Sequence, residues 1–193
     1  MLGAWPGHDR LDPARVGVFG FSVGGFTALV AVGGVPDMAR EGAFCAEHPD
    51  EWPCRMAKEH ATGSSPSQRP ASAWVHDDRI KAAVVVAPAL GPTFTSAGLA
   101  NVRVPIQLWR GEDDPILRHP YFAQAIYDAL PSKPEYHVVL KAGHFSFQVP
   151  CSDALARRAP DLCIDEPGFD RVGFHKTFNA AVVDFFGAHL PVQ

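Results

Sequence analysis

The sequence lacks an excess of charge of either sign, a long apolar run and a recognisable secretion signal, and each absence argues against a class of protein. It holds 17 Lys and Arg against 21 Asp and Glu, a net charge of −4, unlike the basic composition of nucleic-acid-binding proteins. No apolar run approaches the ~20 residues that a membrane-spanning helix needs. Residues 1–10 have no basic region followed by an apolar core, so they do not resemble a signal peptide and predict a cytoplasmic protein. We therefore expect no nucleic-acid partner and no membrane span.

Cysteine is scarce, with four residues in 193, but the four form two local pairs. Cys45 lies near Cys54, and Cys151 lies near Cys163, each pair in a segment rich in Pro, Asp and Arg. Closely spaced cysteines in even number predict two short disulfides, and hence a periplasmic or secreted protein. Four reduced thiols in a cytoplasmic protein are the alternative, which the absence of a signal peptide favours. The gaps are wider than the roughly two to four residues typical of zinc ligands, so no metal is expected at the cysteines.

The length and the hydrophobic pattern predict one α/β domain that covers residues 1–193. Single hydrophobic cores commonly span about 100–200 residues, and 47% of this chain is hydrophobic. Short runs that are apolar throughout alternate with segments of helical spacing, as in a parallel sheet covered by helices on both faces. The expected strands are residues 16–19, 81–87, 106–110 and 136–140, and the expected helices are residues 23–32, 121–130 and 174–190.

A long polar segment interrupts this alternation between the first two strands. Residues 38–79 are predicted to be mostly loop, with one short helix. A loop of this length between strands usually serves a function, so we interpret it as a lid or a substrate wall over a site.

The strongest local motif is Gly20-Phe21-Ser22-Val23-Gly24, a G-x-S-x-G sequence between the first strand and the first helix. In this context the motif indicates a nucleophile elbow, in which a strained turn projects the serine hydroxyl above the carboxyl edge of the sheet. We expect side chains at Gly20 and Gly24 to collide within so tight a turn. The following helix directs its N-terminal amides at developing negative charge, and the Val23 amide is the expected oxyanion donor. A glycine-rich turn with a solvent-facing serine is the alternative.

An acidic residue and a histidine follow later strands in the order that serine hydrolysis requires. Asp114 and His144 each come after a predicted strand, so with Ser22 they meet at the carboxyl edge of the predicted sheet. In this interpretation Ser22 is the nucleophile, His144 is the general base and Asp114 orients the imidazole ring. Asp113 is the alternative acid, but Pro115 makes Asp114 the last residue before a rigid bend.

At these residues the chain resembles the α/β-hydrolase superfamily. Within it, the chain is similar to bacterial predicted dienelactone-hydrolase-like proteins, which are related to platelet-activating-factor acetylhydrolase-type esterases. Dienelactone hydrolases proper use a cysteine nucleophile, whereas Ser22 occupies the elbow here, so the resemblance implies a serine carboxylesterase. The resemblance covers nearly the whole chain, through residues 15–27, 80–90, 104–115, 135–147 and 167–186.

The same resemblance implies a sheet that is shorter than in related proteins. The nucleophile strand of such families is the fifth of about eight, whereas here it begins at residue 16. We therefore expect about four core strands, without the loop that normally provides a second oxyanion amide. The strand at 16–19 then becomes an exposed apolar edge, which predicts either a homodimer that covers this edge or a marginally stable protein.

The expected function is hydrolysis of a small-molecule carboxylic ester through an acyl-enzyme intermediate, without a cofactor. Leu90, Ile116 and Phe145 lie beside the loops of the three reactive residues and are predicted to bind the acyl group, although such apolar residues also fit a core. The nine histidines show no metal-ligand pairing such as H-E-x-x-H, so no metal is expected. Amide or lactone hydrolysis by the same residues is one alternative. The other is a non-catalytic hydrolase remnant that acts as an interaction module.

Overall fold

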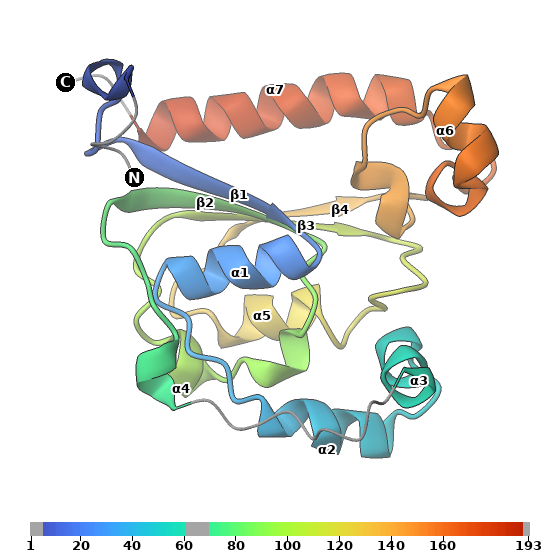
Figure 1. The fold of residues 1–193 in the computed structure, drawn as a ribbon, viewed down its shortest axis with the longest axis horizontal. Helices are drawn as coiled ribbons and strands as arrows, with labels where there is room; N and C mark the ends of the chain where they lie inside the picture. The colour runs from blue at the N-terminus through green and yellow to red at the C-terminus, as the bar shows by residue number, and fades with distance from the viewer. Residues whose placement is uncertain (1–5, 61–69, 191–193) are drawn as a thin grey trace.

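A four-stranded sheet, in which all strands are parallel, forms the centre of the molecule (Figure 1). The computed structural model describes residues 6–60 and 70–190, so residues 1–5 of the N-terminal segment and 61–69 of the predicted loop lie outside the described residues. The strands lie side by side in sequence order, which confirms the predicted α/β class and places each strand close to its predicted range. Their bounds are Val16–Phe21 for β1, Ile80–Val86 for β2, Ile106–Gly111 for β3 and Glu135–Val139 for β4.

Helices cover both faces of the sheet, which explains why the central strands are apolar along their length. Residues 82–86 of β2 are all buried, and alternate residues point to opposite faces. One set packs against α1 (Val23–Ala31) and α5 (Ala123–Ala129), and the other packs against α7 (Arg171–His189). Figure 1 shows α1 and α5 on one side of the sheet and α7 along the other.

The C-terminal helix α7 presents aromatic side chains to the sheet, as its sequence spacing predicts. Phe178 and Phe185 are buried in one cluster with Trp109 of β3. The helix begins earlier than predicted, because the Asp170 side chain accepts a hydrogen bond of 2.9 Å from the Gly173 amide and caps its first turn. The position of α7 is therefore set by both an apolar face and a polar cap.

The segment 38–79 is more helical than predicted. In place of a single short helix it forms α2 (Ala39–Glu47) and α3 (Trp52–Glu59), which a disulfide between Cys45 and Cys54 joins. No residue of α2 is buried, and its residues are mostly polar or small, so no apolar run marks this helix in the sequence. Helices this short are marginal alone, and the covalent link helps to hold them together.

A second disulfide joins Cys151 to Cys163 and closes the segment that carries α6 (Asp153–Arg158). The structure therefore forms both predicted disulfides, with Cα–Cα distances of 5.2 Å for the first and 5.8 Å for the second. Among the described residues, no helix has both the length and the apolar character required to span a membrane. The remaining elements within residues 6–60 and 70–190 are the helix α4 (Ser96–Leu99) and the 3₁₀ turns η1 (His8–Arg10), η2 (Ala71–Ala73), η3 (Gly91–Thr93), η4 (His144–Phe147) and η5 (Pro160–Leu162).

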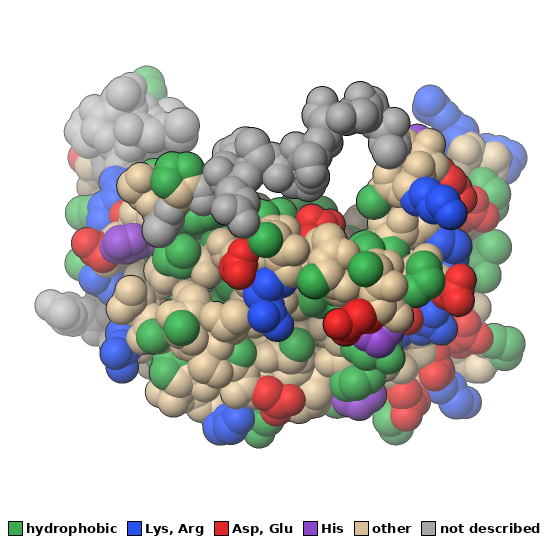
Figure 2. Space-filling model, turned by 90° about the horizontal axis from the view of Figure 1, so that it is seen from below, with side chains coloured by type: hydrophobic (Ala, Val, Ile, Leu, Met, Phe, Trp, Pro, Cys, Tyr) green, Lys and Arg blue, Asp and Glu red, His purple; other side chains and the backbone are tan. Residues whose placement is uncertain are grey.

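Charged side chains of both signs are interspersed on the face of the molecule that carries α2 (Figure 2). This mixture agrees with the near balance of 17 basic and 21 acidic residues in the sequence. Proteins that follow a nucleic-acid backbone instead gather basic side chains along one surface. The visible face therefore carries no electrostatic feature of that kind in its described part.

Candidate active site

The carboxyl edge of the sheet brings Ser22, His144 and Asp114 into one chain of hydrogen bonds. Ser22 follows β1, Asp114 follows β3 and His144 follows β4. Ser22 Oγ lies 3.0 Å from His144 Nε2, and His144 Nδ1 lies 2.8 Å from Asp114 Oδ2. Parallel strands end at the same edge of a sheet, which is why residues separated by up to 122 positions meet here.

Ser22 occupies a strained turn between β1 and α1. Its φ of 57° and ψ of −118° lie outside the regions that residues other than glycine favour. Hydrogen bonds hold the turn from both sides, because the Ser22 amide donates to the Val86 carbonyl (2.9 Å) and the Ser22 carbonyl accepts from the Ala89 amide (3.0 Å). Backbone strain persists only where neighbouring structure fixes it, and it is characteristic of the nucleophile elbow that the motif predicts.

The two glycines of the motif are not equivalent. A Cβ atom at Gly20 would collide with the Gly24 carbonyl, so only glycine fits at position 20, as predicted. A Cβ atom at Gly24 would meet no neighbouring atom within 4 Å, so the predicted collision at that position is wrong. Gly24 is exposed on the first turn of α1, whereas the close approach to β2 is made by Gly25, whose Cβ would lie 3.1 Å from Pro88.

The Asp114 carboxylate is buried, with 5% of the residue exposed, and both of its oxygens accept hydrogen bonds. Oδ1 accepts from the amides of Ile116 and Leu117, each at 2.8 Å, while Oδ2 faces His144. An ionised carboxylate can only accept hydrogen bonds, so His144 Nδ1 carries the hydrogen and Nε2 presents its lone pair to the serine hydroxyl. Asp113 is exposed, and the geometry therefore selects Asp114 as the partner of the histidine.

A polar network supports the loop that carries His144. Ser146 Oγ accepts a hydrogen bond from the Gly143 amide (3.0 Å) and donates one to Asp165 (2.7 Å). Asp165 in turn accepts two hydrogen bonds of 2.8 Å from the Arg171 guanidinium at the start of α7. The residues on both sides of His144 are thus tied to a buried ion pair.

The same network reaches the second disulfide. Arg171, only 6% exposed, donates a further hydrogen bond of 2.9 Å to the Leu162 carbonyl. Leu162 precedes Cys163, so the disulfide-closed segment 151–163 is anchored to α7 beside the histidine loop. Sequence analysis missed this network, because a serine and a carboxylate 19 positions apart form no recognisable motif.

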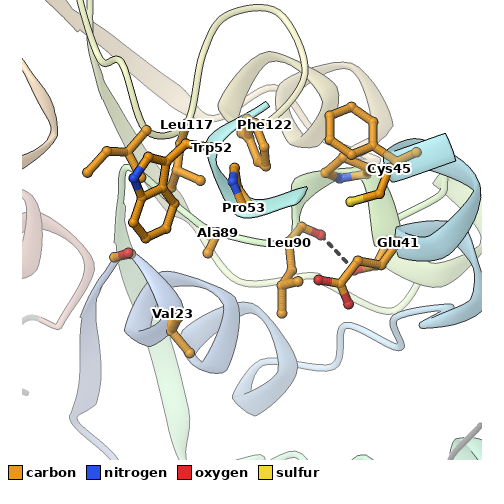
Figure 3. Close-up of a pocket in the computed structure, with 14 residues that line it drawn as sticks. Val23, Glu41, Cys45, Trp52, Pro53, Ala89, Leu90, Leu117 and Phe122 are labelled. Atoms are coloured by element: carbon orange, nitrogen blue, oxygen red, sulfur yellow. Dashed lines mark hydrogen bonds between the residues drawn. The ribbon is translucent and has the colours of Figure 1, made fainter. Parts of the chain in front are cut away.

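An apolar cavity of about 200 Å³ opens beside Ser22 (Figure 3). Helices α2 and α3 form one wall, and the segments that follow β2 and β3 form the other. Leu90 and Ile116, two of the residues predicted to bind the acyl group, both line this cavity. Residues of segment 38–79 therefore form part of the cavity wall next to the serine. The role predicted for this segment, a lid or a substrate wall, stays a prediction.

Phe145, the third residue predicted to bind the acyl group, does not line this cavity. It lies with His144 in a separate surface cleft, and its ring meets the imidazole edge-on with a centroid distance of 5.2 Å. Phe21 packs against the same imidazole at 4.8 Å. Two aromatic rings thus contact the histidine. Sequence analysis identified neither in that role: Phe21 occupies a variable position of the motif, and Phe145 was predicted to bind the acyl group.

Sequence analysis also missed the aromatic side chains of the cavity wall. Phe44, Trp52 and Phe122 line the cavity, and the Phe44 and Phe122 rings meet edge-on with centroids 5.7 Å apart. Phe44 and Trp52 lie within two residues of the cysteines of the first disulfide, Cys45 and Cys54. That proximity is the signal in the sequence that could have found them.

One acidic side chain, Glu41, also lines the cavity, and burial against its apolar wall raises the pKa of this carboxyl group. The first amide of α1, that of Val23, has no acceptor within its helix and adjoins the serine. The arrangement can therefore accept a proton from Ser22 at His144 and stabilise an anion at the start of α1. In the part of the chain that the structure describes, no three His, Cys, Asp or Glu side chains gather as a metal site.

Comparisons with known proteins do not extend this description. No protein-family model matches the chain. No curated protein is significantly similar to it. Inference about function therefore rests on the side chains and their geometry.

Proposed function

We propose that the chain is a serine hydrolase of the α/β-hydrolase type, which cleaves carboxylic esters through an acyl-enzyme intermediate. One observation carries this proposal: Ser22 occupies a strained turn and is hydrogen-bonded to His144, which is hydrogen-bonded to buried Asp114. This combination is how a weakly acidic hydroxyl group becomes a nucleophile near neutral pH.

The first half of the reaction transfers the acyl group to the enzyme. Ser22 Oγ forms a bond to the ester carbonyl carbon while its proton passes to His144 Nε2. The carbonyl oxygen becomes an oxyanion, to which the Val23 amide donates a hydrogen bond. The bond between the carbonyl carbon and the alcohol oxygen then breaks, and the departing alcohol takes the proton from His144. Asp114 stabilises the transient imidazolium without accepting its proton.

The second half returns the enzyme to its starting state. A water molecule attacks the acyl carbon and gives one proton to His144 Nε2. The bond to Ser22 Oγ breaks, the serine regains that proton, and the carboxylic acid leaves. The cavity beside Ser22 would hold the acyl group, and its volume of about 200 Å³ is smaller than the ~300–1,000 Å³ of pockets for drug-sized ligands, which favours short acyl chains.

The two disulfides favour a periplasmic or secreted location. Disulfides persist in oxidising compartments and are rare in the reducing cytoplasm of most cells. Comparing the masses of freshly isolated, alkylated protein before and after reduction tests this. Four alkylated thiols without reduction would contradict it.

A homodimer that covers the exposed edge of the sheet is also part of our proposal. Within the described sheet, β1 pairs on one side only, and its Phe19 side chain is 47% exposed. An edge strand with exposed apolar side chains is a template for pairing with a second chain. Size-exclusion chromatography with light scattering should give twice the monomer mass of 20.8 kDa, and a stable species at 20.8 kDa would contradict the dimer.

The esterase proposal is tested by hydrolysis of p-nitrophenyl esters, from acetate to dodecanoate. Ser22→Ala should lower kcat by at least about 10⁴-fold, because it removes the nucleophile. Ser132→Ala, which changes an exposed serine distant in sequence, is the matched control and should keep wild-type turnover. A fluorophosphonate probe should label the wild type and not Ser22→Ala. An active Ser22→Ala variant, or a wild type that neither turns over nor reacts with the probe, would contradict the proposal.

A further inference from the structure

The lining of the cavity beside Ser22 includes an acidic side chain that the proposed reaction does not use. Of the described residues that line this cavity, Glu41 alone carries an ionisable carboxyl group. Cys45 is the only other titratable type on the wall, and it is held in a disulfide. The remaining walls are mainly aliphatic and aromatic, so Glu41 is a chemical exception in this cavity.

The orientation of Glu41 makes it available to a bound molecule. Figure 3 shows Glu41 and Trp52 on opposite sides of Leu90, with the Glu41 carboxylate turned towards Leu90. No described residue donates a hydrogen bond to this carboxylate, and only burial shifts its pKa, which is raised. The neighbouring Arg40 is not its partner among the described contacts, and the Arg40 Nε donates instead to the Pro92 carbonyl at 3.0 Å.

The Glu41 carboxyl group is partly exposed, and the part of it that lies against the apolar wall without a hydrogen-bond donor carries an energetic penalty. Removing a polar group from water without a compensating hydrogen bond disfavours the folded state, and an ionised group is disfavoured further. A bound molecule that donates a hydrogen bond to Glu41 would remove this penalty. An acyl chain without a donor would leave the carboxylate desolvated and would bind less well.

We propose that Glu41 is a specificity-determining residue, which selects acyl groups that carry a hydrogen-bond donor at the end remote from the ester. This inference rests on the proposed function, because it assumes that the acyl group enters the cavity beside Ser22. The donor is either an ammonium group or a hydroxyl group, and both share the chemistry that a carboxylate recognises. The substrate class is therefore an ester of an ω-amino or ω-hydroxy acid of short to medium length.

Three esters of equal chain length test this proposal: the p-nitrophenyl esters of hexanoic, ω-aminohexanoic and ω-hydroxyhexanoic acid. For the wild type, kcat/KM should be about tenfold higher for the ω-amino ester than for hexanoate, as expected for a hydrogen bond to a charged group. Glu41→Gln should bring this ratio close to one, chiefly by raising KM for the ω-amino ester. Glu47→Gln, an exposed glutamate on the same helix that does not line the cavity, should leave the ratio at its wild-type value.

The outcomes separate this proposal from the esterase proposal. A preference for the ω-hydroxy ester alone, lost in Glu41→Gln, would support Glu41 as an acceptor for neutral donors. Hydrolysis of all three esters at a ratio that Glu41→Gln does not change would overturn the role of Glu41 while leaving the esterase intact. A wild type that cleaves none of the esters and does not react with the fluorophosphonate probe would overturn both proposals.

Discussion

Two disulfide-closed segments flank the carboxyl edge of the sheet, and they are attached to it in different ways. The first joins α2 to α3, and the second carries α6; Figure 1 places α3 and α6 on opposite sides of that edge. The first forms the apolar wall beside Ser22, whereas the second is linked through polar groups to the loop of His144. One segment therefore shapes the space for a substrate, and the other supports a group that moves a proton.

The ion pairs that attach the two segments differ in burial. Glu51 of the first segment pairs with Arg118 at 2.9 Å; the Glu51 side chain is only 8% exposed, but the Arg118 side chain is 50% exposed. Asp165, just after the second segment, pairs with Arg171 at 2.8 Å, and these side chains are only 15% and 6% exposed. A guanidinium in contact with water keeps its solvation when its partner is lost, whereas a buried one does not. Similar covalent links are therefore combined with ion pairs whose guanidinium groups differ in burial.

The largest effect is expected from removing one charge of the buried pair. Asp165→Asn leaves the Arg171 guanidinium buried without a counterion, which should lower the free energy of unfolding by about 3–5 kcal/mol. Chemical denaturation measures this loss. The kcat for p-nitrophenyl esters should also fall, with KM little changed, because Asp165 accepts a hydrogen bond from Ser146 in the histidine loop.

The matched change in the other segment is Glu51→Gln. Because half of the Arg118 side chain stays in water, the free energy of unfolding of the Glu51→Gln variant should be lower than that of the wild type by only about 1 kcal/mol. Equal losses of unfolding free energy in Asp165→Asn and Glu51→Gln would contradict the difference that we infer from the burial of Arg171 and Arg118.

Removal of either disulfide should have the next largest effect, with similar losses of stability but different changes in activity. The disulfides close loops of similar length, with sequence separations of 9 and 12, so replacing either pair with serine should cost about 3 kcal/mol. Loss of the Cys151–Cys163 link should lower kcat for every ester, since the histidine loop loses support. Loss of the Cys45–Cys54 link should instead raise KM and flatten the preference among acyl chain lengths, since the cavity wall loosens.

Steady-state kinetics of the two double variants, at a temperature where both are folded, distinguish these outcomes. Each variant serves as the control for the other, because the expected loss of stability is nearly the same. Identical changes in kcat and KM would show that the disulfides act only on global stability, and the assignment of separate roles would fail.

The difference between the two regions also explains which features could be predicted from the sequence. Buried strands are apolar along most of their length, so β2 and β3 were recognisable. The motif around Ser22 by itself indicated a strained turn between a strand and a helix. The order of Ser22, Asp114 and His144 along the chain sufficed to bring them to one edge, because parallel strands share a carboxyl end. These predictions succeeded because the signal is local or follows from topology.

The remaining features depend on contacts between distant, chemically ordinary residues. Helix α2 buries none of its residues and is mostly polar or small, so it contains no apolar run that would mark it in the sequence. The contact of Ser146 with Asp165 and the position of Glu41 on the cavity wall arise from packing, which leaves no spacing rule in the sequence. The collision expected at Gly24 was wrong because the direction of a side chain on the first helical turn depends on how the helix leaves the elbow.

The smallest effect is a pH dependence of stability at Glu41. Burial raises the pKa of Glu41 in the folded state, so its stabilising contribution is complete below the unfolded pKa and is lost as pH rises through the folded pKa. Glu41→Gln should therefore match the wild type in Tm near pH 4 and exceed it at pH 7. Because this side chain is partly exposed, we expect a difference of at most about 2 °C.

Thermal unfolding of the wild type and Glu41→Gln across this pH range measures the difference. A Tm difference that stays constant with pH would show that the substitution acts through packing rather than charge. If the expected trend is found, the same change from carboxyl to amide has opposite effects on stability at two places. Glu41→Gln stabilises the cavity wall, whereas Asp165→Asn destabilises the support of the histidine loop. The Asp165 carboxylate then stabilises the fold through its partner Arg171. The Glu41 carboxylate instead lowers the stability of the fold, as expected of a group whose partner is a bound molecule.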